Sequence, residues 1–537
     1  MSLRSVPDAG LATHRIRVVL GATLSLALFA CRSDAALPPG PGGSPGEVST
    51  STTTISVATA SVPLGRTTTI SVVPRDAAGA RIGPGLTVEI AVSGGTSTGR
   101  VGDVTFFTFD SSYRAVYTGT GVGTAATVRA TIGGTPLTTT RTLAVQPAPV
   151  QQFTFCSTTG AVCEFIGRRD VMLVAASGVT HTQAFYGSVP CAASGYARGF
   201  SGAPPAAYTE CRIGEEQTVE MPNAMPGMAG LDAAVLQVPL GDAGVPGPLV
   251  RAGSVAPSAP QGEGSFRMTC TLAKMDFFDP IVYPGGANLS HLHMFFGNAD
   301  ITPGSTSPSL TTSGAGTCQG GTVNRTGYWV PAVFDVRTSR VIPPDVATIY
   351  YKTGYNVDPA TIREIPAGLQ MIAGDRGNVG KTQVINALDV ATWGCLKTSR
   401  PVTGAIPDCP VGDMVTLSIN FPQCWDGVRL DSPDHKGHMA YPDYRNPPAR
   451  STCPPSHPVM LPIITEIFRW PVTTGMTPAY WRLTSDMYPA ATRGGYSAHA
   501  DWMNGWTPEF FRLIVTNCLQ PGRDCLVGLL GDGRELY

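Results

Sequence analysis

Twelve cysteines lie between Cys156 and Cys525, and they constrain this chain of 537 residues more than any other feature. Their number is even and none forms a CxxC pair, which argues against zinc ribbons and thioredoxin chemistry. A set of disulfides in an exported protein is the simplest account of them. The candidate pairs that lie close in sequence are Cys156–Cys163, Cys191–Cys211, Cys395–Cys409 and Cys518–Cys525.

The thirteenth cysteine, Cys31, ends a segment typical of an export signal. Basic residues precede an apolar run from Val18 to Ala30, which is too short to span a membrane but has the length of a signal core. The run ends in Leu-Phe-Ala-Cys, which resembles a bacterial lipobox, although Phe29 fits that motif poorly. We predict a signal peptide over residues 1–31 with lipidation at Cys31. The alternative is ordinary signal cleavage a few residues later, with Cys31 removed.

Composition favours a surface-exposed, turn-rich β protein. The net charge is −1, which gives no reason to expect nucleic acid or an anionic membrane surface as a partner. Charged residues make up 14% of the chain, below the roughly 25% of average domains. Residues 32–47 are rich in Pro and Gly and predict a linker. We therefore expect a monomer that is extracellular or an outer-membrane or cell-surface lipoprotein, and that meets the membrane only through its lipid anchor.

Period-two alternation dominates residues 48–147. Thr68–Val73, Leu86–Val92 and Ala126–Ile132 alternate apolar and polar residues, and Gly133-Gly134 supplies a hairpin turn. About a hundred residues of such strands predict a β-sandwich. The segment contains no His or Cys, so we assign it no chemistry and favour a spacer over an adhesive module.

Two short stretches of this segment, Tyr117–Thr120 and Gly123–Ala125, resemble the bacterial Ig-like repeats of intimin and invasin. The resemblance implies an Ig-like domain over residues 48–147. Residues 151–221 contain four cysteines in strand-like segments and predict a small disulfide-bonded β-module. Residues 222–262 are rich in Ala, Gly and Pro and predict a linker or a wrapping segment.

Six of the eight histidines lie in the second half of the chain. In a strand, two histidines separated by one residue project to the same face and can hold one metal ion or one substrate group. A second His pair lies in a loop beside two aspartates, which can orient the imidazoles or bind a cation. We predict that the two pairs form one acid/base or divalent-metal centre. Its predicted residues are His291, His293, His435, His438, Asp431 and Asp434. The alternatives are a core histidine bonded to the backbone for the first pair, and a solvated turn for the second.

Aromatic and polar residues near these motifs predict sugar binding. Trp425 can stack on a sugar ring and Asp426 can accept sugar hydroxyls, although a buried structural Trp425 is an equal alternative. The other predicted substrate-binding residues are Arg325, Trp329 and Asn298.

Three further ionisable features stand out from their surroundings. His457 and the His499-x-Asp501 pair are interpreted as structural, because each occurs singly. Glu466 lies in an otherwise apolar strand, where a buried carboxylate has either a shifted pKa or a partner such as Arg469.

Ordered motifs between Phe266 and Cys518 resemble a family of secreted fungal and bacterial proteins classed as a domain of unknown function. The motifs are Ser290–Asn298, Asn324–Pro331, Asn420–Gly427, Leu430–Pro442 and Cys453–Pro458. Fungal members often carry WSC carbohydrate-binding modules. The resemblance implies a secreted protein that acts on, or is held to, cell-wall polysaccharide, but it supplies no reaction.

Residues 263–537 form the predicted functional domain. Val346–Lys352, Met414–Asn420 and Val459–Phe468 predict strands, and Pro508–Asn517 predicts a helix with Thr507 as its N-cap. We therefore expect a mainly β chain, in which an Ig-like sandwich and a disulfide-bonded module precede a sandwich or jelly-roll domain with few helices.

The leading hypothesis is a cell-surface enzyme, a hydrolase or lyase of polysaccharide, with the His/Asp centre described above. The rival is a non-catalytic carbohydrate-binding or adhesive protein, in which the same residues hold a structural metal. An oxidative copper enzyme is a weaker third hypothesis, because the N-terminal His usual in such polysaccharide oxygenases is missing.

Overall fold

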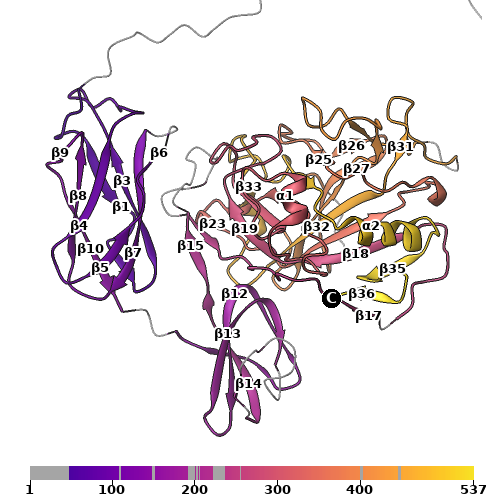
Figure 1. Cartoon of the computed structure of the whole chain (residues 1–537), viewed down its shortest axis with the longest axis horizontal. Helices are drawn as coiled ribbons and strands as arrows, with labels where there is room; N and C mark the ends of the chain where they lie inside the picture. The colour runs from indigo at the N-terminus through magenta and orange to yellow at the C-terminus, as the bar shows by residue number, and fades with distance from the viewer. Residues whose placement is uncertain are drawn as a thin grey trace, which may run out of the picture. The chain divides into compact units, whose positions relative to one another are not determined.

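The computed structural model describes residues 47–107, 111–147, 151–191, 200, 203–204, 206–221, 231, 236–253, 255–398, 403–445 and 449–537. The predicted signal peptide, the lipidated Cys31 and nearly all of the 32–47 linker lie outside these residues. No helix among the described residues is long and apolar enough to cross a membrane. The chain is mainly β, which confirms the predicted fold class (Figure 1).

Residues 47–147 form a β-sandwich. One sheet has the order β1-β3-β7-β5 with β6 beside β7, and the other has the order β2-β10-β8-β4 with β9 beside β8. Ile70 and Tyr117 of the first sheet share a core with Val128 and Leu143 of the second, because alternate residues of each strand face inward. The strands are β1 (Thr54–Val57), β2 (Ser61–Pro63), β3 (Thr67–Val73), β4 (Val88–Ser93), β5 (Thr98–Val101), β6 (Thr105–Phe107), β7 (Ser112–Gly121), β8 (Ala126–Ile132), β9 (Thr135–Pro136) and β10 (Arg141–Gln146).

A four-stranded sheet of order β11-β14-β12-β13 follows. Its strands are β11 (Thr154–Thr158), β12 (Val162–Ala175), β13 (Thr180–Pro190) and β14 (Tyr208–Glu216). The disulfides Cys156–Cys163 and Cys191–Cys211 staple it. A two-stranded ladder of β15 (Thr218–Glu220) and β16 (Gln237–Pro239) comes next along the chain.

The rest of the chain is built on two large sheets. The seven-stranded sheet contains, in order, β26 (Gln383–Ile385), β27 (Leu388–Cys395), β28 (Met414–Asn420), β32 (Ile463–Pro471), β24 (Ala347–Lys352), β18 (Ser265–Cys270) and β35 (Asp524–Val527). The five-stranded sheet contains β19 (Leu272–Asp276), β20 (His293–Gly297), β21 (Gly327–Pro331), β34 (His499–Met503) and β25 (Gln370–Gly374). The ring of Phe296 lies 5.3 Å from that of Phe468, and Trp502 Nε1 donates to Tyr351 Oη at 3.2 Å. The two sheets therefore face each other across one core, as predicted for a sandwich.

Short elements complete this part of the structure. The strands are β17 (Val250–Ala252), β22 (Val333–Asp335), β23 (Arg340–Val341), β29 (Cys424–Trp425), β30 (Met439–Ala440), β31 (Val459–Met460), β33 (Trp481–Leu483) and β36 (Arg534–Leu536). The helices are α1 (Ser307–Thr312), α2 (Pro508–Ile514), a π-helix (Val515–Leu519) and 3-10 turns at Pro359–Thr361 and Pro478–Tyr480.

The outer face of the five-stranded sheet is covered as well. Met294 and Phe296 point into the core between the sheets, so His293 and Phe295 point to the opposite face. Side chains before and after β20 pack against Phe295, Trp329 and Met503 of this face and form a second apolar cluster with them. These side chains are Phe278, Ile281, Ile301 and Leu310, the last of which belongs to α1. Polar side chains on this outer face are consequently buried.

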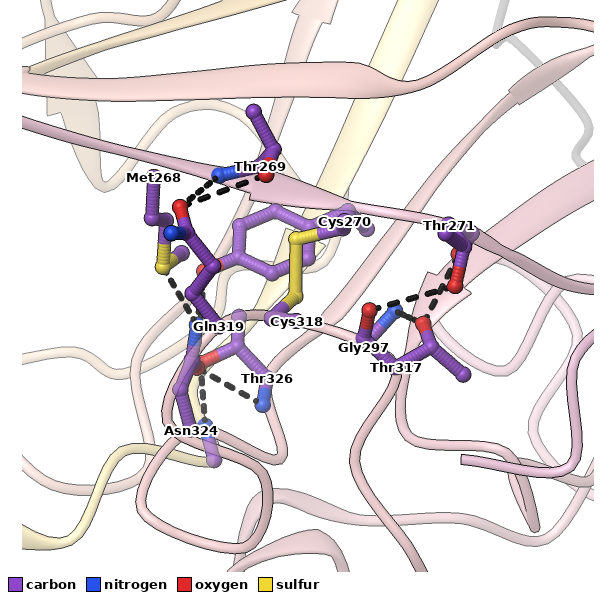
Figure 2. Close-up of a disulfide and its surroundings, with 12 residues drawn as sticks. Met268, Thr269, Cys270, Thr271, Gly297, Thr317, Cys318, Gln319, Asn324 and Thr326 are labelled. Atoms are coloured by element: carbon purple, nitrogen blue, oxygen red, sulfur yellow. Dashed lines mark hydrogen bonds between the residues drawn. A yellow bond between two sulfur atoms is a disulfide. The ribbon is translucent and has the colours of Figure 1, made fainter. Parts of the chain in front are cut away.

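Disulfides connect these elements. All four predicted short-range pairs are present, and the remaining two are Cys270–Cys318 and Cys424–Cys453. Figure 2 shows how Cys270–Cys318 ties the end of β18 to the segment before β21. There Thr317 Oγ1 donates to Thr271 O at 2.8 Å and accepts from Gly297 N at 2.9 Å. These contacts hold β20 at Gly297, its last residue.

The predicted elements differ from the observed ones mainly at their ends. β28 has the predicted bounds, and β24 starts one residue late. The strand predicted over Val459–Phe468 is interrupted before β32, where Pro462 lacks the N–H that a ladder needs. Thr507 is the N-cap residue of α2, but its side chain makes no capping bond.

Candidate metal centre

Three histidines converge at one end of the covered outer face. His293 begins β20, His499 begins β34, and His291 lies two residues before β20. His293 pairs with Pro331 of β21, and the β21–β34 register continues to place His499 on the other side of Pro331. Two strand spacings measure about 9.6 Å, yet the rings of His293 and His499 are 5.9 Å apart, so they lean together over Pro331. The ring of His291 lies 4.3 Å from that of His293 and 5.1 Å from that of His499.

The ring nitrogens of this cluster are arranged as metal ligands. One nitrogen from each of the three histidines lies within 4.8 Å of the other two. His293 Nδ1 is 2.9 Å from Phe278 O, and His499 Nδ1 is 2.9 Å from Ser497 O. A carbonyl can only accept, so both Nδ1 atoms carry the proton and both Nε2 atoms keep a lone pair. The buried Nε2 atoms of His291 and His293 have no hydrogen-bond partner among the described residues.

Electrostatics keep these imidazoles neutral. Burial, and then the nearby His293, lowers the pKa of His499 to about 3. Burial likewise lowers the pKa of His291, well below its ordinary range, and that of His293. The neutral imidazole is the form that binds a metal ion.

Two carboxylates complete the cluster. Asp501 follows His499 by two residues and so shares its face of β34, while both of its oxygens are buried without a partner among the described residues. Carboxylate oxygens of Asp279 and Asp501 lie with a His293 nitrogen within 4.8 Å of one another. Burial, and then the charge of Asp279, raises the pKa of Asp501 well above its ordinary value. A cation would satisfy this carboxylate.

The donor set fits a first-row divalent transition metal. Three imidazole nitrogens with carboxylate oxygens suit zinc, iron, manganese, cobalt, nickel or copper, whereas Mg²⁺ and Ca²⁺ prefer oxygen-only shells. In a tetrahedral site with Zn–N bonds of about 2.0–2.1 Å, the nitrogens would lie roughly 3.4 Å apart. The observed separations, within 4.8 Å, require only a small inward movement of the rings.

The segment between β33 and β34 positions the histidines. Thr484 Oγ1 donates to Leu292 O at 2.6 Å, which anchors the backbone between His291 and His293. Ser497 Oγ donates to Asp486 Oδ1 at 2.6 Å, and Ser497 O accepts the His499 Nδ1–H. Both His-bearing segments are thus held by one buried loop.

A cavity of about 280 Å³ opens from the cluster. Its walls include Asp279, His291, His499 and Asp501 from the cluster. The remaining charged or titratable wall residues are Asp375, Arg376, Asp434, His435 and Lys436. A ligand in the cavity would therefore reach both the metal position and a set of ionisable groups.

The structure changes the predicted ligand set. His291 and His293 lie in the cluster as expected, and His435 and Asp434 line the same cavity. His438 does not join them, because it is fully buried with Nδ1 3.0 Å from Ser432 Oγ and Nε2 2.8 Å from Gln370 O. Both of its ring nitrogens are occupied, and His499 takes the place predicted for it.

The residues predicted to bind sugar lie elsewhere. Trp329 is fully buried and cannot stack on a glycan. Asn298 Nδ2 donates to Leu310 O and Ser313 O, and Arg325 donates to Thr311 O and Gly314 O, so both hold the segment around α1.

Trp425 and Asp426 belong to a turn outside the cavity. Trp425 Nε1 donates to Arg429 O at 2.6 Å, and Asp426 forms an ion pair with Arg429 at 2.7 Å. Neither residue lines the cavity. These contacts stabilise the turn itself.

Sequence reasoning missed His499 and Asp501. The signal was present, because two residues of a strand separated by one share a face, the same argument that selected His291 and His293. Glu466 is fully buried without a partner among the described residues, while Arg469 donates to Thr348 Oγ1 instead. Burial, and then Asp501, raises the pKa of Glu466 well above its ordinary value.

Residues 279–506 match the model of a protein family described as "Domain of unknown function (DUF1996)". This match agrees with the family resemblance of the motifs and covers the whole His/Asp cluster. No curated protein matches the chain.

Solved structures with some likeness include three bacterial surface proteins. The Escherichia coli adhesin FdeC is 18% identical over 31% of this chain and 56% of that chain, with a TM-score of 0.18. The Yersinia pseudotuberculosis adhesin InvE is 17% identical over 41% of this chain and 74% of that chain, with a TM-score of 0.18. Invasin, a bacterial integrin-binding protein, is 10% identical over 70% of this chain and 57% of that chain, also at 0.18. The chain thus spans little more than half of FdeC, and these scores are too low to support an inference about activity.

Proposed function

We propose that residues 263–537 form a metal-dependent enzyme that cleaves extracellular polysaccharide by hydrolysis or elimination. The observation that carries the proposal is the convergence of three imidazoles beside the carboxylate of Asp501. Two of the imidazoles bury an Nε2, and these nitrogens and that carboxylate have no hydrogen-bond partner among the described residues. Burying so many unpaired polar atoms is costly, and one bound divalent cation would satisfy them together.

The cavity favours a catalytic metal over a structural one. Structural zinc sites are closed by four protein ligands, whereas catalytic sites keep a position for water or substrate. Here His291 is only partly buried and lines an open cavity together with His499. When bound, the metal would supply Lewis-acid activation of water or of a substrate oxygen.

The substrate class is supported by less direct observations. Six disulfides are typical of a protein that folds in an oxidising, extracytoplasmic compartment. The family resemblance implies contact with cell-wall polysaccharide. Arg376 and Lys436 in the cavity wall can neutralise the carboxylate of a uronic acid unit. We propose further that lipidation of Cys31 holds the enzyme at the cell surface.

The test begins with metal content. Protein purified without a His-tag is dialysed against Zn²⁺, Mn²⁺, Co²⁺ and Cu²⁺, and bound metal is measured by mass spectrometry. We expect one ion per chain in the wild type and none in His499→Ala. His181→Ala is the matched control, because His181 Nε2 is also buried without a partner but belongs to no such cluster. A wild type that binds none of these ions would overturn the proposal.

The loaded protein is then incubated with microbial wall polysaccharides. New reducing ends indicate hydrolysis, and absorbance from a new C=C bond indicates elimination. Metal-dependent glycan binding without either product would instead support the rival function, a non-catalytic wall-binding or adhesive protein.

A further inference from the structure

The loop of residues 431–438 forms a wall of the cavity beside the metal cluster. It carries His435, whose hydrogen-bond partner differs from those of the cluster histidines. We propose that His435, held by Asp431, is the residue that accepts and returns the proton during cleavage at this site. This inference rests on the proposed function, and it assigns to the loop a role distinct from metal binding.

The loop is docked beside the strand that carries the metal ligands. His438 Nε2 lies 2.8 Å from Gln370 O, and Lys436 Nζ donates to Gly374 O at 2.5 Å. Both carbonyls belong to β25, in which Gly374 pairs directly with His499 of β34. These contacts place the loop over the same end of the sheet as the histidine cluster, which agrees with His435 and His499 lining one cavity.

The loop is also internally rigid. Asp434 Oδ1 accepts from Ser432 Oγ at 2.6 Å and from Gly437 N at 2.8 Å. The bond from Ser432, followed by those from the backbone, lowers the pKa of Asp434, so the carboxylate stays ionised and holds the turn. His435 itself has a φ of +58°, a left-handed conformation that costs energy in a non-glycine residue. The fold therefore keeps this side chain in one position at a local cost.

His435 forms an imidazole–carboxylate dyad. Its Nδ1 lies 2.9 and 3.1 Å from the two oxygens of Asp431, which can only accept, so Nδ1 carries the proton and Nε2 keeps a lone pair. Asp431 does not line the cavity and His435 does, so the ring edge with Nε2 is the one available to a ligand. Among the described residues, none bonds to this Nε2.

The dyad differs from the metal cluster in what it can do. Two imidazoles of the cluster, those of His293 and His499, are hydrogen-bonded to backbone carbonyls and face each other, as ligands do. His435 is instead hydrogen-bonded to a carboxylate, which orients the imidazole while the ring lines the cavity. With a side chain 24% exposed, it also remains accessible to substrate.

The proton transfer balances for either reaction class. In hydrolysis, Nε2 takes a proton from water, and the water oxygen bonds to the anomeric carbon as the glycosidic C–O bond breaks in the same step. The electron pair of that bond goes to the glycosidic oxygen, which takes up a proton from water, and the imidazolium returns its proton to solvent. In elimination, Nε2 takes the C5 proton of a uronic acid unit, and the C–H electrons form the C4=C5 bond. The C4–O bond breaks and its oxygen receives the proton. Neither route needs an oxidant or a reductant.

The test compares His435→Gln and Asp431→Asn with the wild type and with His181→Gln, using fully metal-loaded protein. The polysaccharide is the one that the wild type cleaves fastest. We expect His435→Gln to bind metal as the wild type does and to lose roughly 10²–10⁴-fold in kcat with KM nearly unchanged. The kcat of Asp431→Asn should lie between those of the wild type and His435→Gln, because this substitution leaves the imidazole in place without its orienting charge.

Chemical rescue separates a proton-transfer role from a structural one. Added imidazole should restore part of the kcat of His435→Ala and none of the activity of His499→Ala, whose defect is loss of metal. A kcat of His435→Gln within threefold of the wild-type value would refute the proton-transfer role of the dyad but not the proposed function. Loss of metal from that variant would do the same. A wild type without metal-dependent cleavage would instead refute the proposed function, and the dyad's role with it.

Discussion

The β-sandwich of residues 47–147 and the five-stranded sheet of residues 263–537 differ in the solvent exposure of their outer faces. In β8 of the sandwich, Val128 and Ala130 are buried, while Arg129 between them is exposed to water. In β20, β21 and β34, every residue on both faces is buried. Each sheet of the sandwich therefore needs only one apolar face. The five-stranded sheet has a second buried face, and the polar groups on that face need partners.

The contrast shows where ligand chemistry can be found in this chain. Arg129 on the sandwich satisfies its charge in water at little cost. His293 and Asp501 are fully buried, and their inner polar atoms have no hydrogen-bond partner among the residues that the structure describes. Buried polar atoms are nearly always paired, so a group of unpaired ones on a rigid sheet indicates a missing ligand.

The largest expected effect is on metal affinity. His293→Ala should weaken binding of Zn²⁺ by roughly 10²–10³-fold, because structural zinc sites yield about 10–16 kcal/mol shared among four ligands. Isothermal titration of the tag-free protein measures the affinity, with His181→Ala as control. Equal Zn²⁺ affinities of His293→Ala and His181→Ala would contradict a metal site on the five-stranded sheet.

The second prediction tests the sandwich by itself. Ile70 is fully buried in β3, so Ile70→Ala should lower the free energy of unfolding of this part by about 3 kcal/mol. In denaturant unfolding, the sandwich of this variant should unfold at a lower denaturant concentration than in the wild type. Its metal stoichiometry should remain that of the wild type. A parallel loss of metal would mean that the two regions are not independent.

A smaller effect should come from the loop that supports His499. Asp486 accepts from Ser497 Oγ and from Gly495 N, so Asp486→Asn should loosen the carbonyl that orients His499. We expect 10–100-fold weaker metal binding, as for other residues behind metal ligands. The control is Asp443→Asn, which removes a partly exposed carboxylate paired with Arg445. A lower melting temperature with unchanged affinity would limit Asp486 to a role in folding.

The buried Glu466 predicts a pH dependence. Its raised pKa means that the folded state keeps a proton that the unfolded chain releases above its ordinary pKa of 4.5. Its contribution to stability is therefore complete below pH 4.5 and falls by up to about 1.4 kcal/mol per pH unit above it. Glu466→Gln should match the wild type at pH 4 and unfold at higher denaturant than the wild type at pH 7. The same difference at both pH values would show that Glu466 does not titrate on unfolding.

The smallest effect is expected at a surface turn. Asp426 is paired with the partly exposed Arg429, so Asp426→Asn should cost less than about 1 kcal/mol of stability. Binding of wall glycans, measured by a pull-down assay, should change less than twofold. A larger loss would return Asp426 to the substrate-binding residues proposed from the sequence.

Part of the candidate site was accessible from the sequence. Alternation placed His291 and His293 on one face, and the polar loop around His435 stood out by its density of ionisable groups. His438 was misplaced because the hydrogen bond that occupies its Nε2 is made to Gln370 O, and Gln370 lies 68 residues away. His499 was interpreted as structural because its neighbours in space lie about two hundred residues earlier in the chain.

The sequence by itself determined the features that depend on residues close along the chain. The alternation of β8, the bounds of β28 and the bridge between Cys518 and Cys525 are of this kind, since strand periodicity and short loops are local properties. Tertiary structure alone decided that β34 lies beside β21, and that Cys270 meets Cys318 across a separation of 48 residues. The metal centre depends on that strand order. Strand neighbours are set by the packing of both sheet faces, and local periodicity carries no information about which distant strands will pair.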